Sequence, residues 1–383
     1  MRALLLLVGV LGALAQQELG FAARGAQSPS VAETQPAVAP SPPQPFDEWL
    51  ADLRREARAR GFSDSVVQQL DDLQPLERVI SADRSQAELN PGFNRYLSAR
   101  LTKAMVRRGQ EQSRAYRTTL ARVERQFKVQ QEILVAVWGI ETRYGRLTGR
   151  TPVLQALATL AWEPRRSSYF RSELFDALTM VSQRHVEARA MTGSWAGAMG
   201  QTQFMPSSYL RHAVDFDKDG KSDIWQSTPD ALASIASYLK AYGWDGTYTW
   251  GREVSMTPAV RVRIADRVPR RTEGCYARRN MTERLPLDEW SEMGVRREDG
   301  GPLPKSSVPA GLVDVGERLF LVYPNYDAIL AYNCAHYYAL SVALLADEIN
   351  AAPNPNAQIP KPKSQTVKAR SPQSGARSPR RTR

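Results

Sequence analysis

Histidine and cysteine are scarce in this sequence, with three histidines and two cysteines among 383 residues. The histidines, His185, His212 and His336, are too scattered to match the ligand spacing of a zinc site. Glycine-rich loops of the phosphate-binding type are missing, and the serine within Gly193–Gly197 stands at the wrong position for a hydrolase nucleophile. The sequence therefore excludes zinc sites, phosphate-binding loops and serine nucleophiles of the kinds that a sequence motif identifies.

Long apolar runs are also missing after the N-terminus. The apolar segment at residues 3–14 follows one basic residue and is too short to span a bilayer, so residues 1–23 are predicted to be a signal peptide. An uncleaved anchor is the less favoured alternative. Neither Cys275 nor Cys334 lies just after this segment, which leaves no cysteine there to carry a lipid. We expect a soluble, exported, periplasmic protein with no transmembrane helix in its mature form.

Acidic residues are absent from residues 351–383, which contain eight lysines and arginines. Without these eight charges the net charge of +11 falls to +3, so the basic character belongs to a tail and no nucleic-acid partner is expected. The tail is predicted to be disordered, and it either holds the protein near anionic polymers or has no function. Residues 24–45, with six prolines, are predicted to be a disordered linker.

The body of the chain shows mainly the periodicity of helices. Helices are expected over 46–60, 63–73, 91–108 and 113–127, within a helical domain spanning 46–130. Thr151-Pro152 and Thr228-Pro229 are typical helix starts and lie in a second domain, 131–245.

The periodicity changes near residue 246. Val260, Val262 and Ile264 alternate with arginines, which predicts a strand in a small β subdomain spanning 246–324. The run Leu319–Tyr323 predicts another strand. A single long helix, 326–349, is expected to close the fold within 325–350. The predicted fold class is α+β, mainly α.

An acid stands among core residues at the end of one predicted helix. Ile133, Val137 and Glu141 share a helical stripe that is otherwise apolar, and glycines end the helix soon afterwards. Burial there would raise the pKa of Glu141, as a general acid requires. The alternative is a structural ion pair with Arg143 or Arg146.

The segment Gly193–Pro206, GSWAGAMGQTQFMP, contains small residues that permit close backbone approach. Polar and apolar groups at short range are added by Gln201, Gln203, Phe204 and Met205. An acid on an apolar stripe, with aromatic residues and amides nearby, favours a carbohydrate ligand.

The spacing of an EF-hand-like loop occurs once. Asp215, Asp217, Asp219 and Asp223 fill positions 1, 3, 5 and 9, with Gly220 at position 6 and the Lys221 carbonyl at position 7. Hard oxygen ligands at this spacing suit a structural Ca²⁺. Position 12 is not the usual glutamate, and an Asp-rich turn that only caps helices is the alternative.

The two cysteines fall in the β subdomain and in the closing helix. In an oxidising compartment Cys275 and Cys334 are candidates for a disulfide, although two separate thiols fit the sequence nearly as well.

Five separated segments, in the right order, resemble those of the membrane-bound lytic murein transglycosylase B family: WGIETRYG, LATLAWEPRR, GSWAGAMGQTQFMPSSY, DFDKDGKSDIW and NYDAILAYNCAHYYALSVALLAD. The resemblance covers about residues 46–350. It implies a lysozyme-like catalytic core with a helical domain and a small β domain. It also implies cleavage of the β-1,4 bond between N-acetylmuramic acid and N-acetylglucosamine in peptidoglycan, leaving a 1,6-anhydromuramoyl end.

The resemblance also implies roles for individual residues. Glu141 matches the catalytic acid, Ser194 and Gln203 match residues beside it in the cleft, and Asp230 matches a carboxylate that completes the calcium loop. Further glycan- or peptide-contacting positions match Tyr96, Arg165, Arg166, Phe204, Met205, Tyr238, Tyr332, Asn333 and Tyr338.

One glutamate suffices if the sugar's own C6 hydroxyl is the nucleophile, because the same group can first donate and then accept a proton. A muramidase that uses water needs a second carboxylate, and neither Glu163 nor Glu173 shows a pattern that fits this role. An inactive wall-binding scaffold is the other alternative, against which the intact Glu141 motif argues. The expected partners are peptidoglycan strands and other cell-wall enzymes.

Overall fold

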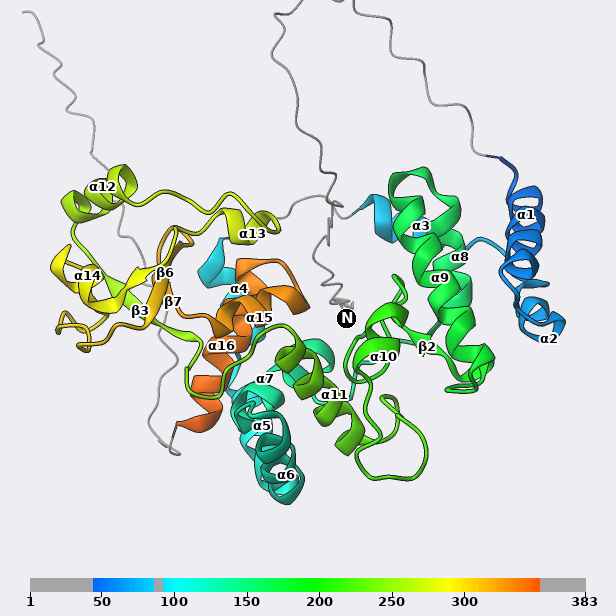
Figure 1. Cartoon of the computed structure of the whole chain (residues 1–383), viewed down its shortest axis with the longest axis horizontal. Helices are drawn as coiled ribbons and strands as arrows, with labels where there is room; N and C mark the ends of the chain where they lie inside the picture. The colour runs from blue at the N-terminus through cyan, green and yellow to red at the C-terminus, as the bar shows by residue number, and fades with distance from the viewer. Residues whose placement is uncertain (1–43, 86–91, 352–383) are drawn as a thin grey trace, which may run out of the picture. The chain divides into compact units, whose positions relative to one another are not determined.

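The computed structural model describes residues 44–85 and 92–351. The predicted signal peptide, the linker up to residue 43 and the tail from residue 352 lie outside these ranges. The described chain is mainly helical with a small antiparallel sheet, which confirms the predicted fold class (Figure 1). Within the two described ranges, no helix has the length and apolar character needed to cross a membrane.

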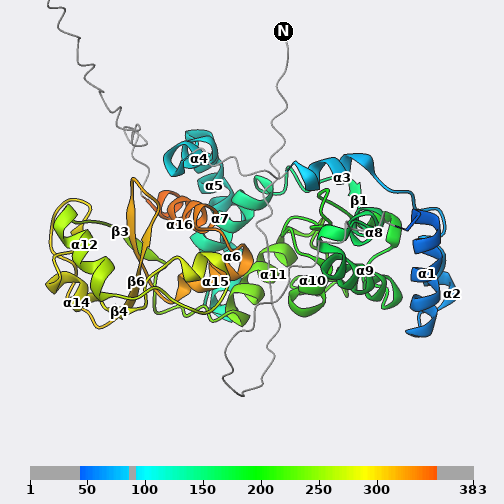
Figure 2. The same cartoon turned by 90° about the horizontal axis from the view of Figure 1, so that it is seen from above.

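The first of three hydrophobic cores joins the N-terminal helices to the middle of the chain. Its elements are α1 (Phe46–Ala59), α2 (Asp64–Val67), η1 (Gln68–Leu70), α3 (Glu77–Arg84), β1 (Thr151–Pro152), α8 (Val153–Trp162), η2 (Pro164–Arg166), α9 (Ser167–Ser182), η3 (Ala188–Ala190), β2 (Thr192–Gly193) and α10 (Pro206–His212). Leu53 of α1 and Val67 of α2 are fully buried in one cluster with Leu157 of α8 and Leu178 of α9. Figure 2 shows α1 and α2 beside the α8–α9 pair.

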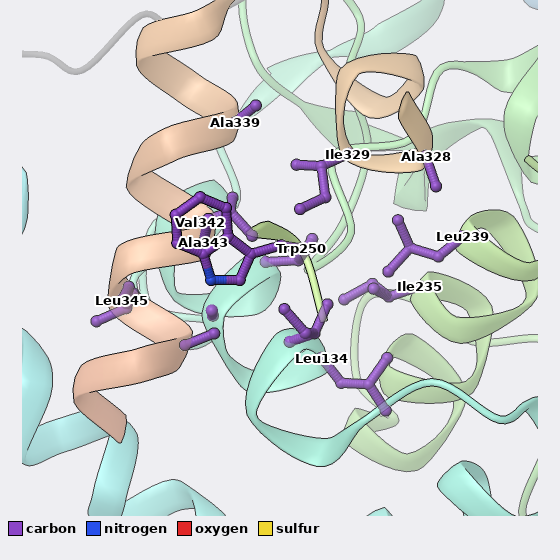
Figure 3. Packing of buried hydrophobic residues seen from close by; sticks show 14 of the residues in the cluster. Leu134, Ile235, Leu239, Trp250, Ala328, Ile329, Ala339, Val342, Ala343 and Leu345 are labelled. Carbon is purple, nitrogen blue, oxygen red and sulfur yellow. The ribbon is translucent and has the colours of Figure 1, made fainter. Parts of the chain in front are cut away.

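The second core surrounds α7. Its elements are α4 (Phe93–Arg100), α5 (Lys103–Ala115), α6 (Arg117–Phe127), α7 (Gln131–Thr142), α11 (Thr228–Ala241), α13 (Tyr276–Arg279), α15 (Asn325–Tyr332) and α16 (His336–Asn350). Residues 133–139 of α7 are all buried, because α5, α6, α11 and α16 pack around it. Figure 3 shows Leu134 of α7 near Ile235 of α11, and Trp250 against Val342 of α16.

The third core belongs to the β subdomain. Its elements are β3 (Gly251–Ser255), α12 (Pro258–Arg267), β4 (Leu285–Pro286), α14 (Leu287–Glu292), β5 (Arg296–Arg297), β6 (Pro309–Asp314) and β7 (Leu319–Val322). The strands form one antiparallel sheet in the order β4-β6-β7-β3-β5. Trp290 of α14 and Ile264 of α12 pack into the same cluster as Leu321 of β7.

The predicted strand around Val260 is wrong, and the segment is α12. Val260 and Ile264 are buried four residues apart, whereas Val262 is 63% exposed, so the burial repeats with the period of a helix. Thr257 caps this helix, because its hydroxyl accepts a hydrogen bond from the Val260 amide, and Pro258 follows as the first helical residue. The helix start at Thr257-Pro258 therefore determines the secondary structure of this segment, despite the alternation of three apolar side chains with arginines. The other predicted strand, at Leu319–Tyr323, corresponds to β7.

The predicted helix 91–108 is two helices, α4 and α5. Thr102 separates them, and its hydroxyl caps the first turn of α5. Gly109, the residue directly after the predicted helix, lies inside α5. A Cβ there would stand 2.6 Å from both the Ile349 side chain and the Tyr144 hydroxyl oxygen, so this glycine makes room for α16 and for the turn after α7. Its role is packing and not termination.

The predicted closing helix is also two helices, α15 and α16, separated by Asn333, Cys334 and Ala335. Apolar periodicity continues across the interruption, which is why the sequence indicates one helix. The Thr151-Pro152 helix start is likewise wrong, because these residues form β1 and pair with Thr192–Gly193. Helix α8 begins one residue later, at Val153.

A disulfide joins Cys275, which precedes α13, to Cys334 between α15 and α16. Their Cα atoms are 6.3 Å apart, and the bond closes a loop with a sequence separation of 59. The Ala277 amide donates a hydrogen bond to the Cys334 sulfur. The bond therefore fixes the interruption between α15 and α16 to the segment that precedes α13.

We expect the double variant Cys275→Ser/Cys334→Ser to unfold at lower urea concentration than the wild type. Chain entropy alone assigns about 4 kcal/mol to a loop of this length, and measured losses are commonly about 2–5 kcal/mol. Reductant should lower the wild-type midpoint towards that of the variant and leave the variant unchanged. A wild-type midpoint that does not respond to reductant, or two titratable thiols in the folded protein, would contradict the bond.

Candidate active site

The turn after α7 is unusually tight. Arg143, Tyr144 and Gly145 all have positive φ, so three successive left-handed residues reverse the chain directly after Thr142. The Tyr144 hydroxyl donates to the Met105 carbonyl at 2.9 Å. Its ring lies over Gly139 of α7, where a Cβ would be 2.7 Å from a ring carbon. The turn is thus packed against the helix whose last residues it follows.

Glu141 lies in the last turn of α7 and keeps part of its surface exposed. Its Oε1 accepts a hydrogen bond from the Tyr338 hydroxyl of α16. Burial raises the pKa of Glu141 to about 8, and the smaller effect of the Tyr338 hydrogen bond lowers it. Among the ion pairs between described residues, none includes Glu141, Arg143 or Arg146, so the structural ion-pair alternative is not what this structure contains. At neutral pH the carboxyl carries a proton.

Aromatic side chains surround this carboxyl. The charge of Glu141, when ionised, raises the pKa of Tyr96, Tyr332 and Tyr338, which places all three hydroxyls near it. Burial is the larger cause in each case. The rings of Phe204 and Tyr238 continue the cluster, with centroids 5.8 and 4.7 Å from that of Tyr332. Apolar faces with polar edges suit a sugar ligand.

Several polar atoms in this region have hydrogen-bonding capacity left for a ligand. The Ser194 hydroxyl accepts from the backbone amides of Ala196 and Ala198, so its own proton can be donated. Gln203 has a φ of 52° and donates its amide to backbone carbonyls at 3.0 and 3.1 Å, so the amide oxygen is left. Asn333 is 6% exposed, and its Oδ1 has no partner among the described residues. Met205 is buried beside this group.

The glycines of the 193–206 segment are required by close backbone approach, as predicted. A Cβ at Gly193 would lie 2.1 Å from the Ala198 carbonyl oxygen, and one at Gly149 would lie 2.1 Å from the Gly193 carbonyl oxygen. Gly200, with a φ of 60°, packs against the backbone at Ile224. The segment therefore lies directly on its neighbours, which fixes the positions of Ser194 and Gln203.

Both acids that were considered as a second carboxylate have structural partners. Glu163 accepts a hydrogen bond from Arg84 at 2.9 Å. Glu173 accepts from both the amide and the hydroxyl of Ser207, at 2.9 and 2.8 Å, and so caps α10. Both groups are committed to structural contacts.

Arg165 and Arg166 form a separate group. Both guanidinium groups contact the carboxylate of Asp83, which is 2% exposed, and Arg165 binds it through two nitrogens at 2.9 and 3.0 Å. The arginines hold the pKa of Asp83 below its ordinary value, although its burial acts in the opposite direction. Among the described residues, no hydrogen bond or ion pair links this group to Glu141. Sequence reasoning missed Asp83, because α3 was not predicted.

The Asp-rich loop brings three carboxylates together. Oxygen atoms of Asp215, Asp217 and Asp230 lie within 4.8 Å of one another. Asp230 has no exposed surface, and burial raises its pKa. Asp219 and Asp223 are not members of this group; Asp219 accepts a hydrogen bond from the Lys221 amide, and Asp223 accepts from two amides of its own turn.

The buried acid, with aromatic rings and free amide groups around it, defines a carbohydrate-cleaving class of site. Comparison with known proteins agrees. The Transglycosylase SLT domain matches residues 45–347, and the chain belongs to this family.

The chain is 32% identical over 295 residues to the membrane-bound lytic murein transglycosylase B of Escherichia coli (strain K12), covering 76% of this chain and 75% of that protein. It matches SltB3 of Pseudomonas aeruginosa in complex with NAG-anhNAM-pentapeptide, with 40% identity, a TM-score of 0.73 and 80% of each chain covered. It also matches the Escherichia coli lytic transglycosylase Slt35 in complex with calcium, with 28% identity, a TM-score of 0.65, and 78% and 92% of the chains covered.

The raised pKa of Glu141 predicts a pH-dependent effect of Glu141→Gln on stability. The pKa of Glu141 in the folded protein, about 8, lies above the ordinary value of 4.5. The contribution of this group to the free energy of unfolding is therefore complete below pH 4.5 and is lost as the pH rises towards 8. The glutamine variant cannot ionise. In urea unfolding, the free energy of unfolding of the wild type should therefore fall relative to that of the variant between pH 4.5 and 8. A difference that stays constant with pH, or equals that of the exposed control Glu187→Gln, would contradict the burial.

Proposed function

We propose that this protein is a lytic murein transglycosylase in which Glu141 alone serves as acid and then as base. The single observation that carries this proposal is a lone buried carboxyl, hydrogen-bonded to Tyr338, with no second carboxylate beside it. The membership of the chain in the transglycosylase family and its likeness to a neighbour crystallised with an anhydro-muropeptide support the same reading.

In the first step Glu141 protonates the leaving oxygen of the β-1,4 bond. A pKa of about 8 keeps the proton on the carboxyl at neutral pH, while the developing charge on the leaving oxygen draws it away. Tyr338 then donates its hydrogen bond to the carboxylate that results. Activity should therefore fall as the pH rises through about 8.

In the second step the C6 hydroxyl of the same sugar attacks the anomeric carbon, and Glu141 accepts its proton. The nucleophile is already tethered, so no separate water has to be bound and oriented. Ser194, Gln203 and Asn333 are assigned to the N-acetyl group, because each has hydrogen-bonding capacity left near Glu141. Their contacts would orient its carbonyl towards the positive centre that forms when the bond breaks.

The water-using muramidase is disfavoured by the contacts of the other acids. A hydrolase of the ordinary kind needs a second carboxylate as base or nucleophile. Glu163 and Glu173, the two acids considered for this role, are both bound to structural partners. An inactive scaffold would have no need for a protonated acid, and the burial of such a group is unfavourable.

The products of peptidoglycan digestion test the proposal. We expect the wild type to release muropeptides that are lighter by one water than muramidase products and that contain no oxygen from labelled water. Glu141→Gln should lower the rate by about 10³-fold or more, because the amide can neither donate nor accept the proton. Glu132→Gln, at the half-buried start of the same helix, should remain active. Reducing ends labelled by water in the early products would identify a muramidase instead.

We infer further that the Asp-rich loop binds Ca²⁺ for stability. The donors fit this ion, because three carboxylates meet there and none of the loop acids is paired with a lysine or arginine within the described ranges. Asp215, Asp217 and Asp230 would hold the ion, and Asp219, Asp223 and the Lys221 carbonyl are assigned as further ligands. Slt35, which this chain resembles, was crystallised with calcium. The ion would neutralise a cluster that otherwise repels itself.

Thermal unfolding with calcium and with chelator tests this assignment. Calcium at 100 times its dissociation constant should add about 2.7 kcal/mol to the free energy of unfolding. Asp217→Ala should abolish the calcium-dependent shift, whereas Asp266→Asn, an exposed acid outside the loop, should retain it. The same melting temperature for the wild type in calcium and in chelator would leave only an Asp-rich turn that caps helices.

The remaining assignments concern substrate and location. Arg165 and Arg166 are proposed to meet acidic groups of the peptide stems, since Asp83 leaves both arginines partly exposed. Peptidoglycan strands are the proposed partner, and the signal-like N-terminus supports a periplasmic location.

A further inference from the structure

Gln201 is a buried amide between α7 and the Asp-rich loop, and it is only 5% exposed. Its Oε1 accepts hydrogen bonds from the Trp138 indole nitrogen at 3.0 Å and from the Thr228 hydroxyl at 3.4 Å. Its Nε2 donates to the Trp225 carbonyl at 3.2 Å. Gly145 makes room for this amide, because a Cβ there would lie 2.7 Å from Oε1. Three bonds in a closed space leave the side chain little freedom.

The backbone of Gln201 adds two more bonds. Its amide donates to the Ile224 carbonyl at 2.8 Å, and its carbonyl accepts from the Thr142 hydroxyl at 3.1 Å. Trp138 precedes Glu141 by three positions, and Thr142 follows it by one. Gln201 is therefore bonded to the last turn of α7 on both sides of Glu141.

We propose that Gln201 is a positioning residue that sets the rotation of the last turn of α7, and with it the direction of the Glu141 carboxyl. It acts through Trp138 and Thr142 and touches no reacting atom. Successive helical residues are about 100° apart, so a small rotation of this turn moves the carboxyl away from Tyr338. The proposal rests on the function proposed above and assigns to that site a residue outside its substrate-facing group.

The neighbours of Gln201 explain why rotation matters. The Thr202 carbonyl accepts a hydrogen bond from the Tyr332 hydroxyl at 2.6 Å, and Gln203 follows. The same short segment thus holds the acid-bearing helix and the groups assigned to the sugar. An error at Gln201 changes the distance between acid and substrate, and about 1 Å of misplacement can lower a rate by about 10²-fold.

The first test is Gln201→Leu in the full-length protein, with release of muropeptides from purified peptidoglycan as the assay. We expect kcat to fall by about 10- to 100-fold with KM changed by less than about threefold. The groups that bind the substrate remain in place, and only the direction of the Glu141 carboxyl changes. Water admitted at the loosened turn should lower the pKa of Glu141, since burial is what raises it. The alkaline limb of the kcat profile should then move to lower pH.

A second variant separates positioning from stability. Gln201→Leu alone leaves the buried Trp138 nitrogen without an acceptor, whereas adding Trp138→Phe removes both partners and should restore much of the melting temperature. Low kcat should persist in this double variant. The matched control is Gln155→Leu, which removes an amide that donates to the Gln74 carbonyl at 2.9 Å, and which should alter stability only.

Wild-type kcat and an unmoved alkaline limb in Gln201→Leu would overturn the proposal, as would a double variant that regains kcat together with stability. If Gln201→Leu does not fold, the double variant decides the question. Failure of the proposed function is recognised separately, because it appears in the products of the wild type.

Discussion

The contact between Glu141 and Tyr338 is the interaction on which the rest of the site depends. The carboxyl at the end of α7 stays neutral because it is largely buried, and α16, which packs against α7, contributes to that burial. The hydroxyl of Tyr338 offsets part of that cost and remains ready to stabilise the ionised form. Burial raises the pKa of Glu141, whereas the hydrogen bond lowers it. The resulting pKa lies near the working pH, so the carboxyl can hold its proton and also release it to the substrate.

Three segments that are distant in the chain must meet at this point: the end of α7, the 193–206 segment, and the interruption between α15 and α16. Glycines allow the first two to touch backbone to backbone. The disulfide at Cys334 secures the third. Gln201 then joins the first segment to the second with side-chain and backbone bonds together. The site is thus built by close packing, with little reliance on surface ion pairs.

The sequence was sufficient to select Glu141, the small residues around Gly193 and the Asp-rich loop, because each breaks a local pattern. Asn333 was selected by family resemblance, yet its position in an interruption was not predicted, since apolar periodicity continues through it. The alternation of apolar residues with arginines predicted a strand where the structure has α12, a helix that begins at the Thr257 cap. Asp83 leaves no local signal, and Gln201 stands out only as one polar group of the 193–206 segment. Their partners lie far away in the chain, and only the tertiary structure brings them together.

The position of α16 near the end of the fold has a consequence for the timing of activity. Tyr338 follows Glu141 by 197 positions, so α7 is synthesised well before the helix that covers it. Until α16 docks, water reaches the carboxyl, and its pKa stays close to that of an ordinary glutamate. The carboxyl that keeps its proton at neutral pH is therefore completed only when α16 has docked. A chain that ends before α16 lacks Tyr338 and leaves Glu141 with an ordinary carboxyl.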